Sequence, residues 1–296
     1  MTEASALAGA LRAYVESQSS RGVSILDLAL QPRDGSDAVT GRVLTARQAR
    51  DVGDLAREHG AALAIQVAAD PDSGLEVGWV ETVVPVLDLW REPSRAGEEM
   101  GRQTQYLDVD GPLRQFGTDG DFLLVQGRDL AMGWAAASDV RASDAASGRA
   151  AWATVARATD GAERAAARPG ATVAAVLERA RAELDVPYVW GGTTHAGFDC
   201  SGLVERVMLD ATGVLMPRHT GDQRRVGARV ASDPRAADLL FAAPLNQRVG
   251  HVLLMTSADT VLHACRTEHR VIEEGLAENA RRYRHQGYRR PVSLQP

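Results

Sequence analysis

The sequence predicts an α+β protein: a small α/β unit, a stretch of short strands, and a C-terminal domain in which a helix carrying a cysteine packs on an antiparallel sheet. Three observations predict it. Helical and strand-like hydrophobic spacings alternate near the N-terminus, short strand-like runs bounded by turn residues follow, and a glycine loop leads into a helix with one apolar face in the C-terminal part. A length of 296 residues favours two or three domains.

Residues 1–77 are expected to form the small α/β unit. Hydrophobic spacing predicts a helix over residues 7–15 and strands over residues 24–30, 39–44 and 61–69. Thr45 is typical of an N-cap, and the helix that it begins runs to Glu58 and is closed by Gly60. This segment contains no catalytic constellation, so we expect it to be a structural or docking domain.

Residues 78–142 have a different pattern, in which short strand-like runs replace the alternation of helix and strand. Strand-like runs at residues 79–90, 103–109, 122–126 and 131–137 lie between Gly, Pro, Asp and Ser turns. With the pair Gly133-Trp134 near its end, the segment resembles a bacterial SH3-like barrel. The Ala-, Arg- and Ser-rich residues 143–170 are then expected to be a linker that is partly helical, followed by a domain over residues 171–296.

Cys200 is the most informative residue of the chain. The glycine loop Gly191-Gly192 and the run Gly197-Phe198-Asp199 deliver it to the first turn of a helix that Gly213 ends. The free N–H groups and the positive end of the helix dipole favour an anion at this position. We therefore expect the thiol pKa to fall from roughly 8.5 towards neutrality, which suits a nucleophile. The alternative is an inert buried cysteine.

A nucleophilic cysteine needs a base, and the base needs a group that orients it. His251 and His263 lie in two apolar runs separated by the turn residues 257–260, which predicts a hairpin with both imidazoles on one face. A histidine satisfied within the core is the alternative for each. His195 and His219 are the other two histidines to follow, because one precedes the cysteine loop and one follows Pro217-Arg218.

These motifs together resemble the NlpC family of papain-like cysteine peptidases, which cut bacterial cell-wall peptides. The resemblance covers about residues 172–291, in which three separated motifs keep the family's order and spacing. It departs mildly from the family at Asp185 and Ala237, where glycine is common. The matching residues are Tyr188, Trp190, Gly191, Gly192, Phe198, Asp199, Cys200, Ser201, Gly202, Leu203, Pro217, Arg218, Gln223, Asp238, Leu239, Leu240, Phe241, His251, Val252, His263, Ala264, Arg289 and Arg290.

The resemblance implies a role for each matching polar residue. Cys200 would attack an amide carbonyl, His251 would transfer the proton, and His263 would fix the tautomer of His251. The Cys200 N–H would stabilise the oxyanion. The residues implied in oxyanion or substrate binding are Tyr188, Trp190, Asp199, Ser201 and Arg218. Helix capping alone is the alternative for Asp199 and Ser201, and plain core packing is the alternative for Trp190.

Composition excludes several other classes of protein. The chain has no lysine, so a P-loop lysine and a Schiff-base lysine are both absent. The net charge is −6 and no arginine stripe alternates with aromatic residues, so we expect no nucleic-acid partner. No apolar run reaches the ~20 residues of a membrane span. Two cysteines without a C-x-x-C motif predict neither a disulfide framework nor a metal site, and we expect no cofactor.

The residues alone predict a thiol acyl-transfer enzyme. The resemblance implies the bond and the substrate: hydrolysis of the amide between γ-D-glutamate and an L-diamino acid of muropeptides, through a thioester acyl-enzyme. In recycling members of the family the SH3-like domain walls off the cleft and binds the substrate's free amine. Glu98 or Glu99 is our candidate for the acidic group, and solvated turn charges are the alternative for both. Either Tyr106 replaces the family's tyrosine, or the amine is held less tightly. The open alternatives are a secreted endopeptidase of intact wall, an amidase or acyltransferase, and a non-catalytic wall-binding protein.

The N-terminal sequence lacks a basic region followed by a long apolar stretch, so a cytoplasmic recycling enzyme is expected. A trimmed N-terminus would reopen secretion. The sequence leaves the oligomeric state open.

Overall fold

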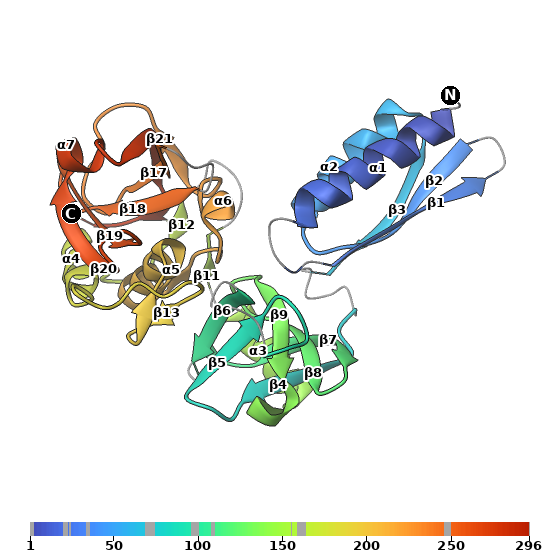
Figure 1. Ribbon diagram of the computed structural model, residues 1–296, viewed down its shortest axis with the longest axis horizontal. Coiled ribbons are helices and arrows are strands. Elements are labelled where there is room, and N and C mark those ends of the chain that lie inside the picture. Colours follow the sequence, from blue (N-terminus) through green and yellow to red (C-terminus); the bar gives the residue numbers. More distant parts are fainter. Residues whose placement is uncertain are drawn as a thin grey trace.

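In a computed structural model, the described residues form three larger sheets, of three, seven and six strands, and three two-stranded ones (Figure 1). The structure describes residues 3–19, 23, 25–33, 36–68, 75–95, 101–107, 110–154, 156–158, 164–245 and 250–295. Mixed helices and mainly antiparallel strands confirm the predicted α+β class. Of the described helices, none is long and apolar enough to cross a membrane. The domain boundaries and the SH3-like character of the second unit stay predictions.

The N-terminal unit is a three-stranded sheet that two helices cover on one face (Figure 1). Its elements are α1 (Glu3–Ser19), β1 (Leu26–Arg33), β2 (Ser36–Val43), α2 (Ala46–Glu58) and β3 (Ala62–Val67). Helix α2 begins as predicted, because Thr45 and Gln48 form a reciprocal capping box. Gly60 follows the helix with φ +67°, a conformation that favours glycine.

The second unit is a seven-stranded sheet with the strand order β10-β4-β7-β8-β9-β5-β6. The strands are β4 (Gly78–Thr82), β5 (Val86–Trp90), β6 (Arg102–Leu107), β7 (Leu113–Asp119), β8 (Phe122–Gln126), β9 (Met132–Ala136) and β10 (Val140–Ala142), with the 3₁₀ helix η3 (Ala137–Asp139) before β10. Strands β7 and β10 were not predicted. Strand β7 escapes the alternating pattern because it buries Arg114 and has an irregular register between Gln115 and Gly117.

The segment predicted as a partly helical linker packs on both neighbouring units. Helix α3 (Ala145–Ala153) buries Trp152, whose ring meets Trp79 edge-on at 5.7 Å and whose Nε1–H donates to the Pro112 carbonyl at 2.9 Å. Two short strands, β11 (Ala156–Arg157) and β12 (Ala165–Ala166), then pair with two short strands of the C-terminal unit, β15 (Val214–Leu215) and β22 (Val292–Ser293). The segment therefore contributes to both cores.

The C-terminal unit packs helix α5 (Cys200–Thr212) against a six-stranded sheet with the order β16-β21-β17-β18-β19-β20. Its sheet strands are β16 (Ala228–Val230), β17 (Leu239–Pro244), β18 (His251–Met255), β19 (Thr260–Cys265), β20 (Arg270–Gly275) and β21 (Tyr283–Arg290). The remaining elements are α4 (Val173–Arg181), β13 (Thr193–Thr194), β14 (Gly197–Phe198), β15 (Val214–Leu215), α6 (Thr220–Gln223), α7 (Leu276–Asn279) and β22 (Val292–Ser293).

Helix α5 and the hairpin of β18 and β19 agree with the sequence prediction. The helix ends at Gly213, which has the predicted left-handed conformation with φ 73°. Strands β18 and β19 pair antiparallel, with Leu254 opposite Leu262. Ten of the 13 residues of α5 are buried, so both its sides are covered by protein.

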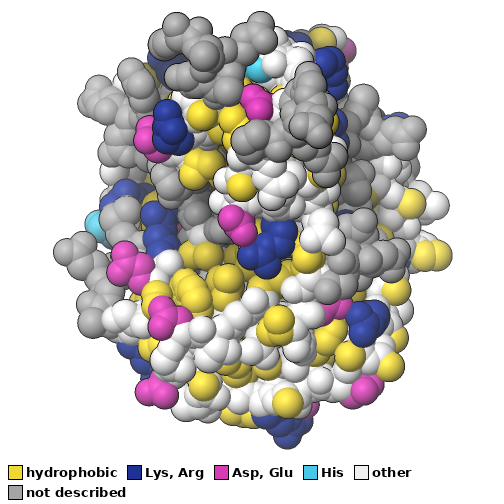
Figure 2. Space-filling model, turned by 90° about the vertical axis from the view of Figure 1, so that its right-hand side faces the viewer, with side chains coloured by type: hydrophobic (Ala, Val, Ile, Leu, Met, Phe, Trp, Pro, Cys, Tyr) yellow, Lys and Arg dark blue, Asp and Glu magenta, His cyan; other side chains and the backbone are white. Residues whose placement is uncertain are grey.

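Polar contacts join the three units. Arg206 of α5 binds Asp110 of the second unit at 2.9 Å, and Arg47 of α2 binds Asp222 of α6 at 3.1 Å. The first two units share a small apolar cluster around Leu44, Ala68 and Met132. Figure 2 shows the side of the molecule that lies to the right in Figure 1; charged side chains of both signs are scattered over it, and hydrophobic side chains gather in its lower half.

Replacing Trp152 with alanine is expected to lower the free energy of unfolding of the second unit by about 3–5 kcal/mol, because a packed aromatic ring is lost. Urea unfolding followed by intrinsic fluorescence and circular dichroism measures this change. The control is Thr154→Ala at the exposed end of the same helix, for which a change within about 0.5 kcal/mol is expected. Equal, small effects of both substitutions would show that this segment is only a tether.

Candidate active site

Cys200 is the first residue of α5, and the loop before it is held tightly. Asp199 is the N-cap, and its carboxylate accepts hydrogen bonds from the backbone N–H of Gly202 at 2.8 Å and of Gly191 at 3.0 Å. Gly202 has to be glycine, because a Cβ there would overlap the carbonyl of Gly192. The loop and the first turn of the helix therefore fix the position of the thiol.

Arg218 lies beneath this first turn and is almost fully buried. Its guanidinium binds both oxygens of Asp199 at 3.0 and 2.6 Å and donates to Ser201 Oγ at 2.9 Å. Its Nε–H donates to Thr104 Oγ1 of strand β6 at 2.7 Å. Arg218, Asp199 and Ser201 thus form a buried network that supports Cys200, and the second unit completes it.

A cavity of about 440 Å³ opens at Cys200. Of the residues that were predicted to bind substrate, Tyr188, Trp190, Asp199 and Ser201 line this cavity, and Arg218 does not. Because Asp199 and Ser201 are bound to Arg218, capping and support of the helix account for their contacts. The described lining is Arg91, Tyr188, Trp190, Asp199, Cys200, Ser201, His219, Thr220, Gly221, Arg224, Phe241, Ala242, Ala243, Pro244, Gly250, His251, Arg266, Tyr283 and Gln286.

His251 lines the same cavity and begins a chain of hydrogen bonds. Its Nε2 lies 2.8 Å from Nδ1 of His263, and Nε2 of His263 lies 2.9 Å from Oε1 of Glu274. The Tyr283 ring stacks on the His251 ring with centroids 4.7 Å apart. Glu274 was missed in the sequence, although it lies two residues beyond Ile272, the residue opposite His263, and so shares a face with His263.

Glu274 sets the proton positions along this chain. Burial acts to raise its pKa, but hydrogen bonds from His263, Asn279 and Arg282 outweigh burial and lower the pKa to about 2. A carboxylate only accepts hydrogen bonds, so Nε2 of His263 carries a proton and Nδ1 of neutral His263 accepts. Nε2 of His251 then donates, which leaves Nδ1 of His251 with a free lone pair as the proton acceptor.

Burial also keeps both imidazoles neutral. It lowers the pKa of His251 well below 6.5, and the charge of protonated His263 adds to this effect. Burial lowers the pKa of His263 too, against the opposing influence of Glu274. A lowered pKa means that protonated His251 loses its proton more easily. The neutral form of His251, which can accept a proton, therefore persists below pH 6.5.

The thiol differs from the sequence expectation. Burial, followed by the negative charge of Asp199, raises the pKa of Cys200 to about 11, and the Val252 N–H, Thr220 and Arg218 offset this only in part. The helix start predicted a lowered pKa; burial first, and the Asp199 carboxylate second, shift the pKa in the opposite direction. The resting pair is a neutral thiol and a neutral imidazole.

The remaining predicted candidates fall in different places. His219 lines the cavity, and burial followed by the charge of Arg218 lowers its pKa to about 4. His195 lies 2.9 Å from Glu183, in the surface network with Arg179. Glu98 and Glu99 lie outside the described residues.

The suggestion that Tyr106 binds a substrate amine is wrong. Its ring is part of the core of the second unit, and its hydroxyl is bound to Asp129. Among the described residues, no group of three His, Cys, Asp or Glu side chains is arranged to hold a metal.

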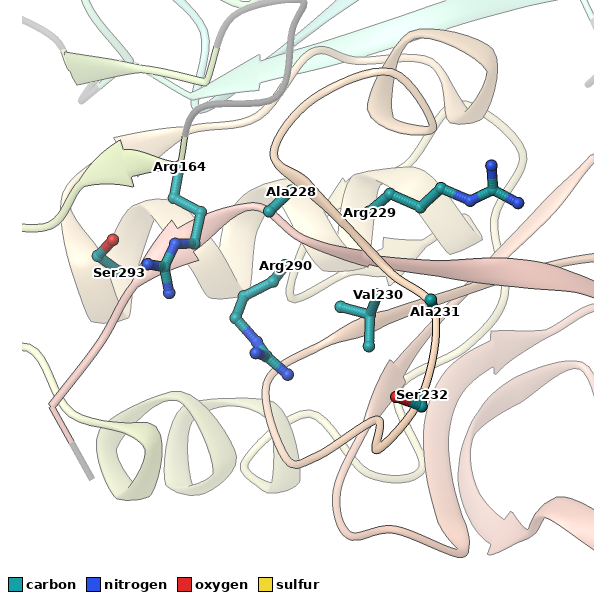
Figure 3. A pocket seen from close by; sticks show the side chains of 8 residues that line it. All are labelled: Arg164, Ala228, Arg229, Val230, Ala231, Ser232, Arg290 and Ser293. Carbon is teal, nitrogen blue, oxygen red and sulfur yellow. The ribbon is translucent and has the colours of Figure 1, made fainter.

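A second hollow of about 670 Å³ lies elsewhere on the C-terminal unit and contains none of the cavity residues above. Figure 3 shows its arginines: the guanidinium of Arg229 points away from those of Arg164 and Arg290. Arg290 is already paired with Asp238 at 2.6 Å. The described lining of this hollow has two serines but no cysteine, histidine or carboxylate that could act as nucleophile or base with them. Cys200 and His251 therefore define the candidate active site.

Residues 185–290 match the profile of the NlpC/P60 family. The matched range includes Cys200, His251, His263 and Glu274. These residues form an NlpC/P60 domain, which confirms the resemblance that the sequence predicted for this part of the chain.

Curated relatives match the same part of the chain. A γ-DL-glutamyl hydrolase of Bacillus subtilis is 36% identical over 111 residues, which cover 36% of this chain and 27% of the relative. A γ-D-glutamyl-L-lysine dipeptidyl-peptidase of the same organism is 39% identical over 87 residues, which cover 28% of this chain and 29% of the relative. The peptidoglycan endopeptidase RipB of Mycobacterium tuberculosis is 39% identical over 83 residues, which cover 23% of this chain and 34% of the relative. The chain thus spans only about a third or less of these relatives.

Solved structures also resemble the chain. An NlpC/P60 family protein from Bacillus cereus has 21% identity and a TM-score of 0.37, covering 77% of this chain and 68% of that one. RipB from M. tuberculosis has 30% identity and a TM-score of 0.34, covering 41% and 65%. With TM-scores below 0.5, these likenesses say nothing about function.

Replacing Glu274 with glutamine is expected to lower kcat by roughly 10²- to 10⁴-fold on the substrate proposed below, while the fold is retained. The amide oxygen is expected to face Arg282, which leaves the amide N–H₂ facing His263. A donor there forces the opposite tautomer on His263 and then on His251, so Nδ1 of His251 no longer accepts. Steady-state kinetics and thermal unfolding of the variant measure the two effects.

The matched control is Glu273→Gln at the preceding position, where the side chain pairs with Arg181. We expect its kcat to stay within about twofold, since Glu273 has no contact with the histidines. A Glu274→Gln variant that is as active as Glu273→Gln would contradict the tautomer assignment.

Iodoacetamide is expected to alkylate Cys200 before Cys265, because Cys200 is partly open to the cavity and Cys265 is fully buried. Since the pKa of Cys200 is about 11, its alkylation rate should keep rising between about pH 7 and pH 10 as the thiolate fraction increases. Peptide mass spectrometry on timed samples measures both rates. A rate that is flat above pH 7 would instead indicate a resting thiolate paired with imidazolium.

Proposed function

We propose that this protein is a cysteine endopeptidase that hydrolyses the γ-D-glutamyl-L-diamino acid bond of muropeptides. One observation carries the proposal: Cys200 and His251 line a single cavity, and His263 and Glu274 leave His251 with its acceptor nitrogen free. This is a nucleophile, a base and an orienting group in the order that thiol acyl transfer needs.

The first half of the reaction forms a thioester. As the Cys200 sulfur attacks the γ-carbonyl carbon, its proton passes to Nδ1 of His251, so no stable thiolate is required beforehand. The oxyanion faces the N-terminus of α5, where the Cys200 N–H and the Tyr188 hydroxyl are the proposed donors. Collapse of the tetrahedral intermediate breaks the C–N bond, and His251 returns the proton to the leaving amine.

The second half consumes water. Nδ1 of His251 takes a proton from the water, whose oxygen attacks the thioester carbon. The C–S bond then breaks, the carboxylic acid product leaves, and the sulfur recovers its proton from His251. The acidic Glu274 keeps the transient imidazolium charge partly balanced through His263.

The choice of bond is supported by the relatives. Two of them are named for a γ-glutamyl linkage, a γ-DL-glutamyl hydrolase and a γ-D-glutamyl-L-lysine dipeptidyl-peptidase. A third is named a peptidoglycan endopeptidase.

We further propose that the substrate is a short free muropeptide, such as a cytoplasmic recycling pathway would supply. The second unit flanks the cleft: it contributes Arg91 to the lining, and Arg102 donates to the Trp190 carbonyl at 3.3 Å. A cleft bounded in this way favours short peptides over cross-linked strands. Cleavage of intact wall is the second candidate, favoured by the relative named peptidoglycan endopeptidase.

Incubation with L-Ala-γ-D-Glu-diaminopimelate is expected to yield L-Ala-D-Glu and free diaminopimelate, which mass spectrometry identifies. Cys200→Ala should give no products and keep the fold, since the nucleophile is missing. His251→Ala should lose roughly 10³-fold or more in kcat, and His263→Ala should lose less, because His263 acts only through His251. Activity in Cys200→Ala would contradict the assignment.

The same assay separates the two candidate substrates. Purified wall sacculi should release soluble fragments at least about tenfold more slowly than the free tripeptide is cleaved, at matched bond concentration. Faster release from sacculi would identify a wall-remodelling enzyme with the same chemistry. A tripeptide product that retains the glutamyl bond would identify an amidase of a different linkage.

A further inference from the structure

The described lining of the cleft is positively charged. It carries three arginines, Arg91, Arg224 and Arg266, and a single carboxylate, Asp199. Asp199 is already neutralised by Arg218, which lies beneath the cleft rather than in its wall. A ligand that enters this cleft therefore meets unbalanced guanidinium charge, which favours an anionic ligand.

The three arginines differ in how many contacts their side chains make with other protein groups. Arg224 donates to Oε1 of Gln286 at 2.5 Å, and the guanidinium of Arg266 lies over the Trp190 ring, 5.9 Å from its centroid. Arg91 has no side-chain hydrogen bond or ion pair to any residue that the structure describes. All the donors of its guanidinium are therefore open to a ligand.

Arg91 is nevertheless held at the site. It follows strand β5 directly, and its backbone N–H donates to the carbonyl of Gly101 at 2.9 Å, which fixes the chain at this point. Burial and the charge of Arg218 lower the pKa of His219, which also lines the cavity, and the charge of Arg91 adds to them. A residue of the second unit therefore acts on groups beside Cys200.

We propose that Arg91 binds a free carboxylate of the peptide substrate, so that the second unit supplies a specificity residue to the cleft. This inference rests on the proposed function. A γ-linked glutamate keeps its α-carboxylate close to the scissile carbonyl, and the diamino acid adds another carboxylate on the leaving side. A guanidinium binds a carboxylate through two parallel hydrogen bonds, which an amide cannot accept in the same way.

The test compares three tripeptides: the free acid, the peptide with the glutamate α-carboxylate amidated, and the peptide with the C-terminal carboxylate amidated. Each is assayed with the wild type, Arg91→Gln, Arg91→Lys and Arg229→Gln. The last variant removes the same charge from the second hollow and is the matched control. Values of kcat and KM are measured separately, and circular dichroism checks each fold.

We expect amidation at one of the two positions to lower wild-type kcat/KM by roughly 10- to 100-fold, mainly through KM, because a charge-assisted pair is lost. Arg91→Gln should show a similar loss on the free acid and should no longer distinguish that amidated peptide. Arg91→Lys should restore part of the loss, and Arg229→Gln should behave as the wild type.

Two outcomes would overturn the inference and leave the proposed function standing. One is a wild-type enzyme that cleaves all three peptides equally well. The other is an Arg91→Gln variant that keeps the full preference for the free acid, which would assign the carboxylate to another group. Failure of the wild type to cleave any of the three peptides would instead count against the proposed function itself.

Discussion

The buried ion pair between Arg218 and Asp199 is the interaction on which the site depends. Asp199 caps α5 and holds the glycine loop, so its position decides where the thiol points. Arg218 holds Asp199 from beneath and is itself held by Thr104 of the second unit. Losing one partner of such a pair leaves an uncompensated buried charge, at a typical cost of about 3–5 kcal/mol. The placement of Cys200 is therefore a property of two units, although the residue belongs to one.

The same carboxylate also affects the nucleophile. A helix start favours a thiolate, but desolvation of the sulfur, followed by the negative charge of Asp199, raises the pKa of Cys200. The two buried imidazoles stay neutral, and the ionised Glu274 directs their protons so that Nδ1 of His251 is left as a proton acceptor. Proton transfer then accompanies attack, and the resting site keeps no separated charges at the thiol.

The sequence could predict what local patterns encode. Helical spacing after a glycine loop placed Cys200 at the start of α5, and alternation placed the hairpin of His251 and His263. It could not single out Glu274 among 39 acidic residues, because only the pairing of β19 with β20 brings that side chain to His263. Strand β7 was missed because its inward arginine breaks the hydrophobic alternation. Arg91 was missed because its position in the cleft depends on how two units meet.

Because protein packs on both sides of α5, the C-terminal unit depends on the particular unit that precedes it. One side packs on the catalytic sheet, and on the other Arg206 reaches Asp110 while Arg218, beneath the helix start, reaches Thr104. A catalytic unit transplanted onto a different neighbour would carry two buried guanidinium groups without these partners. The second unit is thus not an interchangeable attachment. We expect a substitution on one side of these contacts to favour a compensating substitution on the other side. The two units are therefore expected to be inherited together and to diverge as a pair.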